Sequence, residues 1–400
     1  MNAAGQIQRL SGNLGSGMNP KRRRLLQATG LALVGGLVTA GCTKQRAISA
    51  AELVTPMPTL SADAENQAVA MAPAAASTNT PEPARPVDVP RVAADPTNIP
   101  GPVDWTEPRH HQITLETVEV VAEIEPGVTF RYMTFGGQIP GPMIRVRQGD
   151  TVEFTLTSRA TDFMPHNIDF HAVYGTGGGA EATYITPGQS NGLIFKAMFP
   201  GAFMYHCAVP NLDYHISSGM FGIIVVEPPE GLSPVTHEFY LGQHEVYTDK
   251  PAGTQGNHNF AFDTMLRENP TYVLLNGEKY ALTAERHGAM QVKSGDTARI
   301  FFVCGGPNVT SNFHPIGNVW SKVYREGAIL NNPERYVQTV AVPPGSCAIL
   351  EMEFPLPQDV KLVDHAITRV LSKGMLGVIH VEGEPQPDIF NPDLPGDPTG

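Results

Sequence analysis

A short segment near the middle of the chain carries three kinds of metal ligand. The segment HCAVPNLDYHISSGM offers a thiolate, two imidazoles and a thioether, and it runs from His206 to Met220. Two histidines, one cysteine and a weak axial methionine are the ligands of a mononuclear electron-transfer copper. Cys207, His215 and Met220 would supply three of these ligands. The candidate for the fourth is His166, in the segment MPHNIDFH.

Polar residues beside this set predict a second metal site. Side chains on a strand alternate between its two faces, so an inward Cys207 places His206 on the outward face. His166 and His171 are five residues apart and face opposite ways, and Asp169 shares the outward face of His171. Two imidazoles and a carboxylate would then lie together on an outer face. The peptide link between His206 and Cys207 would join the two sites.

The motifs around these residues resemble those of the copper-containing nitrite reductases. The resemblance covers roughly residues 105 to 383, and it rests on HNIDFH, YHCAV, SNFHPIG and LVDHAI. In that family a type 1 copper passes electrons through adjacent Cys and His residues to a catalytic type 2 copper. The resemblance therefore implies an oxidoreductase that reduces nitrite to nitric oxide and water with one electron, and that binds two copper ions per chain.

Carried over position by position, the resemblance assigns a role to each candidate residue. The implied type 1 copper ligands are His166, Cys207, His215 and Met220. The implied type 2 copper ligands are His171, His206 and His365. Asp169 and His314 would form the catalytic pair, and Ile316 would shape the substrate pocket.

The resemblance also implies partners, and one departure from it is visible. The family is a homotrimer with each type 2 copper between subunits, and it takes electrons from a small periplasmic cytochrome c or cupredoxin. Seven residues separate Cys207 from His215, one fewer than in the best-known members. This shorter loop indicates a short-loop subgroup and leaves the colour and potential of the type 1 site open.

Composition and internal similarity predict the fold that positions these residues. With 40 Gly, 36 Pro and 16% charged residues, the chain suits a turn-rich all-β protein. IRVRQGDTVEFTL is echoed by MQVKSGDTARIFF, and GMFGIIVVE by GMLGVIHVE. We expect two tandem cupredoxin-like Greek-key β-sandwich domains, over residues 101–228 and 229–383. Aligning His206 with His365 puts Ala366 opposite Cys207, so the second domain lacks the thiolate but keeps a histidine.

Both ends of the chain have a different composition. Residues 1–42 read as an export signal, with a basic region, an apolar stretch and Ala-Gly before Cys42. A cysteine at this place resembles a bacterial lipobox, which predicts a lipid-anchored protein in the periplasm or at the outer membrane; an incidental cysteine is the alternative. Residues 43–100, rich in Ala and Pro, are expected to be a disordered tether. Residues 384–400 are expected to be a Pro-rich tail.

Several features carry weaker or competing interpretations. The net charge of -12 argues against nucleic acid as a partner. Cys304 and Cys347 are either buried free thiols or a disulfide. The glycine run at 175–179 lacks the following helix of a phosphate loop and is interpreted as an inter-strand turn. The remaining histidines are interpreted as structural. A blue-copper electron carrier and a two-domain multicopper oxidase are the alternative functions.

Overall fold

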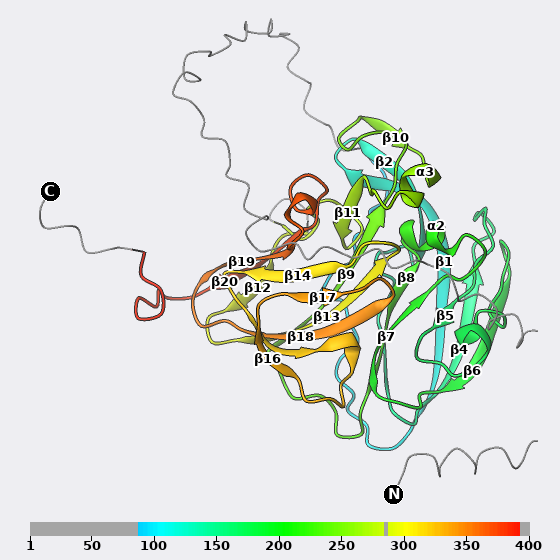
Figure 1. The fold of residues 1–400 in the computed structure, drawn as a ribbon. Coiled ribbons are helices and arrows are strands. Elements are labelled where there is room, and N and C mark those ends of the chain that lie inside the picture. Colours follow the sequence, from blue (N-terminus) through cyan, green and yellow to red (C-terminus); the bar gives the residue numbers. More distant parts are fainter. Residues whose placement is uncertain (1–86, 284–286, 393–400) are drawn as a thin grey trace, which may run out of the picture. The chain divides into compact units, whose positions relative to one another are not determined.

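The structure is a computed structural model, and it describes residues 87–283 and 287–392. The described part is built mainly of β-strands in four sheets (Figure 1). Within these residues, no helix has both the length and the apolar character that a membrane crossing requires. The predicted export signal with Cys42, and most of the predicted tether, lie outside the described residues.

The first sandwich contains the strands β1 (His110–Glu125), β2 (Val128–Phe135), β3 (Ile144–Arg147), β4 (Thr151–Ser158), β5 (Asp169–Phe170), β6 (Ser190–Lys196), β7 (Gly201–His206), β8 (Phe221–Glu227) and β10 (Gly256–His258). One of its sheets has the order β10-β2-β1-β4-β6, and the other has the order β3-β8-β7-β5. Two short helices lie in its loops, namely η5 (Thr176–Gly179) and α2 (Leu212–Ser217).

The second sandwich contains the strands β9 (His237–Val246), β11 (Tyr272–Leu275), β12 (Met290–Lys293), β13 (Thr297–Gly306), β14 (Ser311–Ile316), β15 (Trp320–Tyr324), β16 (Glu334–Val337), β17 (Val340–Val342), β18 (Ser346–Glu353), β19 (Gln358–Asp364) and β20 (Leu376–Glu382). Its sheets have the orders β11-β9-β13-β18-β15-β16 and β12-β20-β19-β14-β17. The short helices are α3 (Phe262–Leu266), η6 (Arg325–Gly327) and η7 (Ile367–Arg369).

Side-chain patterns explain how these strands form layers. In β4 (TVEFTLTS), buried and partly exposed residues alternate strictly, as expected for a sheet with one face on the core. Strand β8 (FGIIVVE) is buried at every position. Apolar residues of β8 contribute to the core of the first sandwich and to a second core that the two sandwiches share. Each face of β8 is therefore covered, which is why its sequence is continuously apolar.

The two halves use the same strand pairings and the same turn chemistry. Strand β3 pairs in parallel with β8, and β12 pairs in parallel with β20. In the turns that follow β3 and β12, Asp150 and Asp296 accept hydrogen bonds from the backbone amides of Arg147 and Lys293. The predicted all-β fold is confirmed: the chain folds as two cupredoxin-like sandwiches.

Two details differ from the sequence-based boundaries. Residues 87–100, which we assigned to the tether, instead pack against the sandwiches, and Val92 is fully buried. The backbone amide of Val92 and the guanidinium of Arg91 both donate hydrogen bonds to Glu278. In addition, β10 follows residue 228 but pairs with β2 in the first sandwich.

Candidate metal centres

Three predicted ligands meet inside the first sandwich. Cys207 Sγ lies 3.5 Å from Nδ1 of His215 and 3.9 Å from Nδ1 of His166. All three side chains are fully buried. A metal ion about 2 Å from each donor would fit between these atoms. One thiolate and two imidazoles match the equatorial ligands of an electron-transfer copper, so the residues present fit this metal.

Loops and a short helix position these donors. Cys207 directly follows strand β7, whereas His215 lies on α2 and not in an irregular loop as we expected. Met220 is fully buried, and its carbonyl oxygen accepts a hydrogen bond from the backbone amide of Cys207. The amide of Met220 in turn donates to the carbonyl of His215. Backbone contacts therefore link three of the four predicted type 1 ligands.

Burial also sets the protonation of the metal-free donors. The apolar surroundings raise the pKa of the Cys207 thiol to about 11. Burial, with the neighbouring His166, lowers the pKa of His215 to about 4. His215 is therefore neutral and ready to bind a metal at neutral pH, whereas Cys207 must lose a proton when a metal binds.

A second donor group lies on the outward face, as the alternation of side chains predicts. Asp169 on β5 pairs in register with His206 on β7. Nε2 of His171 lies 3.1 Å from Nε2 of His206, and Oδ2 of Asp169 lies 3.9 Å from the same His206 atom. Desolvation, together with the nearby His206, lowers the pKa of His171, which favours the neutral form that binds metals.

The second sandwich reaches this group through a loop that sequence reasoning missed. A Cβ atom added to Gly345 would lie 3.7 Å from Cε1 of His171. Pro344 and Gly345 also line an open pocket of about 600 Å³ together with His206 and Asp213. Nothing in the sequence around Gly345, VPPGSC, indicated a contact with His171.

The three remaining predicted site residues lie on the second sandwich. The rings of His314 and His365 are 5.0 Å apart, and both line an open pocket of about 560 Å³. His314 Nδ1 donates to the carbonyl of Gln338 at 2.7 Å. Ile316 is two residues further along β14, so it shares the outward face of His314, and 42% of its surface is exposed.

Hydrogen bonds fix the backbone next to His365. The carboxylate of Asp364 is fully buried and accepts hydrogen bonds from Asn312, Gln243, Arg369 and the backbone amide of Ala366. The amide of His365 donates to the carbonyl of Asn312. The histidine side chain is exposed while its backbone is held on both sides.

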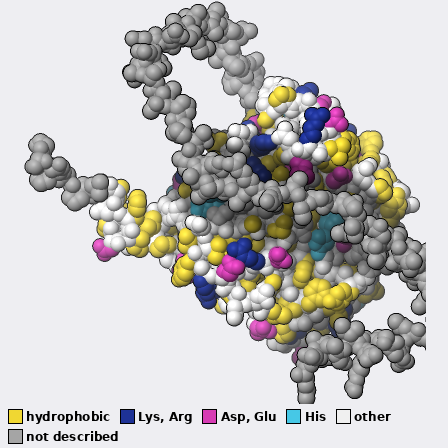
Figure 2. Space-filling view, in the orientation of Figure 1, with side chains coloured by type: hydrophobic (Ala, Val, Ile, Leu, Met, Phe, Trp, Pro, Cys, Tyr) yellow, Lys and Arg dark blue, Asp and Glu magenta, His cyan; other side chains and the backbone are white. Residues whose placement is uncertain are grey.

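The structure therefore divides the predicted site residues among three places. Among the described residues, His365 belongs to neither of the two groups whose ligand atoms lie within 4.8 Å of one another. Figure 2 shows histidine surface at two separate places on the viewed face. The outer group of Asp169, His171 and His206 holds two imidazoles within the chain, and the third predicted one lies elsewhere.

Residues that we interpreted as structural have partners of their own. His111 lies 2.8 Å from Asp150, and His237 lies 2.8 Å from Asp296. Both pairs contain the aspartates of the two equivalent turns. Cys304 and Cys347 are buried and unbridged.

The chain is similar to copper-containing nitrite reductases from several bacteria. It is 44% identical over 296 residues to that of Neisseria meningitidis serogroup A, covering 74% of this chain and 76% of the relative. It is 34% identical over 300 residues to that of Cereibacter sphaeroides, covering 70% and 78%. The solved copper nitrite reductase of Nitrosomonas europaea aligns with a TM-score of 0.61 at 32% identity, covering 70% of this chain and 96% of that one. A family described as multicopper oxidase matches residues 117–231.

Proposed function

The chain belongs to the family of copper-containing nitrite reductases, and we propose that it reduces nitrite to nitric oxide and water with one electron and two protons. One observation carries this proposal. His206 and Cys207 are adjacent in the chain, yet they contribute to two separate groups of metal ligands. An electron received at the inner group therefore has a covalent path to the outer group.

We assign the inner group to a type 1 copper and the outer group to a type 2 copper. Bound copper would accept the donor's electron at the inner group, and at the outer group it would bind nitrite as a Lewis acid and pass the electron on. The protein must then supply protons. We propose that Asp169, whose Oδ2 lies 3.9 Å from Nε2 of His206, donates a proton to nitrite, and that His314 relays protons from solvent.

The type 2 site is proposed to form between chains. The outer group holds His171 and His206, whereas His365 lies on the second sandwich outside that group. A neighbouring chain that placed its His365 over this face would complete three imidazole ligands. A head-to-tail contact of this kind closes into a ring, and we propose a homotrimer in which Ile316, on the face of His314, lies at the nitrite pocket.

The electron donor is proposed to be a small periplasmic cytochrome c or cupredoxin. The donor must approach the inner group, and the buried ligand His215 lies on α2, a short helix that also carries exposed residues. Leu212 on the same helix and Phe262 on α3 are each 45% exposed. The ring of Tyr214, next to His215, packs 5.5 Å from that of Phe262. Apolar surface of this kind suits a transient protein partner.

Export and membrane attachment remain proposals from the sequence. We propose that the chain is exported and acylated at Cys42, which would hold it at a periplasmic membrane surface. Metabolic labelling with a fatty acid analogue, compared between the parent and Cys42→Ala, tests this directly. Label that persists in the variant would remove the anchor at this residue.

Copper analysis combined with spectroscopy tests the enzyme assignment. We expect about two copper ions per chain, the electron paramagnetic resonance signals of both copper types, and nitric oxide formed in proportion to the electrons supplied by a reduced donor. One copper per chain without nitrite turnover would support a blue-copper electron carrier instead. Oxygen consumption in place of nitrite turnover would support a multicopper oxidase.

A further inference from the structure

The glycine run at residues 175–179 lies directly against Asp169. Gly178 has φ +56°, and a Cβ atom built on it would lie 1.9 Å from Oδ1 of Asp169. The same Cβ would lie 2.8 Å from the carbonyl oxygen of Phe170. These distances are far below a normal contact. This run, which we interpreted as an inter-strand turn, has no side chain at Gly178. The Asp169 carboxylate occupies the space that a side chain there would fill.

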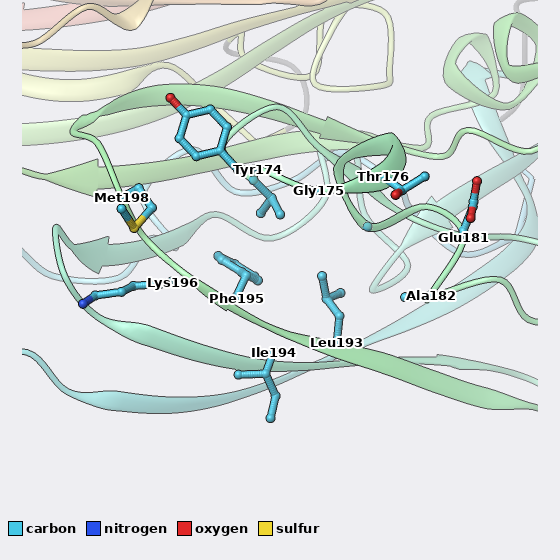
Figure 3. Close-up of a pocket in the computed structure, with 12 residues that line it drawn as sticks. Tyr174, Gly175, Thr176, Glu181, Ala182, Leu193, Ile194, Phe195, Lys196 and Met198 are labelled. Carbon is cyan, nitrogen blue, oxygen red and sulfur yellow. The ribbon is translucent and has the colours of Figure 1, made fainter. Parts of the chain in front are cut away.

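Hydrogen bonds and packing hold this loop in position. The hydroxyl of the buried Thr183 donates to the carbonyl of Gly179 at 3.0 Å, and it accepts from the amide of Ile168 at 3.0 Å. On its outer side the loop borders a pocket of about 800 Å³, where Leu193 lies across from it (Figure 3). A Cβ on Gly179 would meet Leu193 at 2.9 Å. The loop is thus enclosed between β6 and Asp169.

Packing, and not hydrogen bonding, orients this carboxylate. Within the part of the chain that the structure describes, no protein group donates a hydrogen bond to Asp169, whose nearest ionisable partner is His206 at 3.9 Å. The side chain is 26% exposed. With no donor to hold it, its rotamer depends on the surfaces that it touches.

We propose that Gly178 is a positioning residue for Asp169. Because it has no side chain, it lets the carboxylate rest against the loop in the orientation that directs Oδ2 toward the face of His171 and His206. This inference rests on the proposed function, in which Asp169 donates a proton to nitrite. It adds a role for a loop that contributes no side chain to either group of metal ligands.

A pair of glycine variants isolates the effect. Gly177 has φ +55°, nearly the same as Gly178, but a Cβ there would meet only Cβ of Ala180, at an ordinary 3.5 Å. Gly177→Ala and Gly178→Ala therefore impose similar backbone strain and differ in whether the new methyl group meets Asp169 and the carbonyl oxygen of Phe170. We expect Gly178→Ala to lower kcat for nitrite at least tenfold, with KM changed much less. Gly177→Ala should stay within about twofold of the parent.

Two readouts besides turnover separate positioning from general damage. The type 1 spectrum and the copper content of Gly178→Ala should match those of Gly177→Ala, whereas a crystal structure of Gly178→Ala should show the Asp169 carboxylate displaced from its parental rotamer. In an Asp169→Asn background, adding Gly178→Ala should reduce kcat by less than twofold, because both changes act on the same group. Equal kcat values for the two alanine variants, or an unmoved carboxylate, would overturn the inference.

Failure of this inference is distinguishable from failure of the proposed function. Parental turnover in Asp169→Asn would remove the proton donor itself, whatever Gly178→Ala does. If Gly178→Ala does not fold, the double variant with Asp169→Ala tests the same contact, since it removes the oxygen that the methyl group meets. Recovery of the type 1 spectrum in the double variant supports the inference. Continued misfolding would place the conflict at the carbonyl of Phe170 and overturn it.

Discussion

Nε2 of His171 and Nε2 of His206 lie 3.1 Å apart, which is the separation expected for two imidazoles that bind one metal ion. His206 belongs to β7, and Cys207 directly after it faces the opposite way into the inner group. One residue step along the backbone therefore separates two groups of metal ligands.

Cys207→Ala should abolish the visible charge-transfer colour and reduce donor-driven nitrite turnover by at least 10²-fold. The thiolate is the ligand responsible for the colour and the first atom of the path to His206. Absorption spectra and turnover with a reduced donor give the measurement. Cys347→Ala is the matched control, because Cys347 is equally buried but lies in the core that the sandwiches share. Colour that survives in Cys207→Ala would exclude the type 1 assignment.

His365→Ala should lose type 2 copper while keeping the type 1 spectrum. His365 does not belong to the inner group, so its removal leaves the ligands of that group in place. Paramagnetic resonance spectra and copper content measure both sites in one sample. Type 2 copper that persists at the parental level, or a type 1 signal that disappears with it, would show that the ligands are divided differently.

Mixing His365→Ala with His171→Ala tests whether the type 2 site lies between chains. After random subunit exchange in trimers, about a quarter of the interfaces would combine an intact first face with an intact His365, and activity should recover to about that fraction. Each variant alone should remain inactive. The absence of recovery after exchange verified by mass spectrometry would indicate that His365 serves its own chain.

Much of the site follows from sequence because strand alternation is a local rule. The opposite orientations of His206 and Cys207, and the grouping of Asp169 with His171, require only extended backbone in both segments. Both expectations match the structure. The same rule could not place His215, since the segment after Cys207 folds into the short helix α2.

The alternation of side chains along a strand does not predict contacts between segments that are distant in the sequence. Neither the approach of Gly345 to His171 nor that of Gly178 to Asp169 leaves a periodic pattern in the sequence, because each depends on how loops close over β5 and β7. Likewise, composition alone assigned residues 87–100 to the tether. The burial of Val92 depends on a partner far away in sequence, Glu278.

Asp169→Asn should keep both coppers and lower nitrite turnover by about 10²-fold, the usual effect of losing a positioned proton donor. The amide preserves the size of the side chain but cannot deliver a proton at neutral pH. Steady-state kinetics with nitrite, alongside copper content, provide the measurement. Asp104→Asn, which changes a carboxylate whose side chain is 85% exposed, should have parental kinetics. If the two variants behaved alike, Asp169 would have no part in proton transfer.

His314→Ala should also lower turnover by about 10²-fold, because the relay from solvent to Asp169 would lose its imidazole. Copper content should be unchanged, since His314 is not a proposed ligand. The measurement is kcat for nitrite, alongside copper content. A variant with the parental kcat would remove His314 from the relay.

Glu238→Gln should destabilise the protein at neutral pH and change how stability depends on acid. Glu238 joins the sandwiches, because it accepts hydrogen bonds from Arg145 on β3 and Arg299 on β13. Burial opposes its ionisation, but the two guanidinium groups outweigh burial and hold the pKa of this carboxyl below its usual range. The charged form is thus favoured by folding, so its stabilisation is present above about pH 4.5 and is lost as pH falls further.

At pH 7 the free energy of unfolding of Glu238→Gln should be lower than that of the parent by about 2 kcal/mol, the scale for hydrogen bonds to a charged group. Thermal unfolding midpoints measured between pH 3 and 7 should differ most at pH 7 and converge below about pH 4.5, because the parent then loses the charge that the variant already lacks. Glu334→Gln is the control, since its pair with Arg325 is exposed on both sides. Water and salt screen such a pair, so its removal should leave the midpoint unchanged at every pH. A constant difference between parent and Glu238→Gln across this range would mean that the interaction depends on the shape of the side chain and not on its charge.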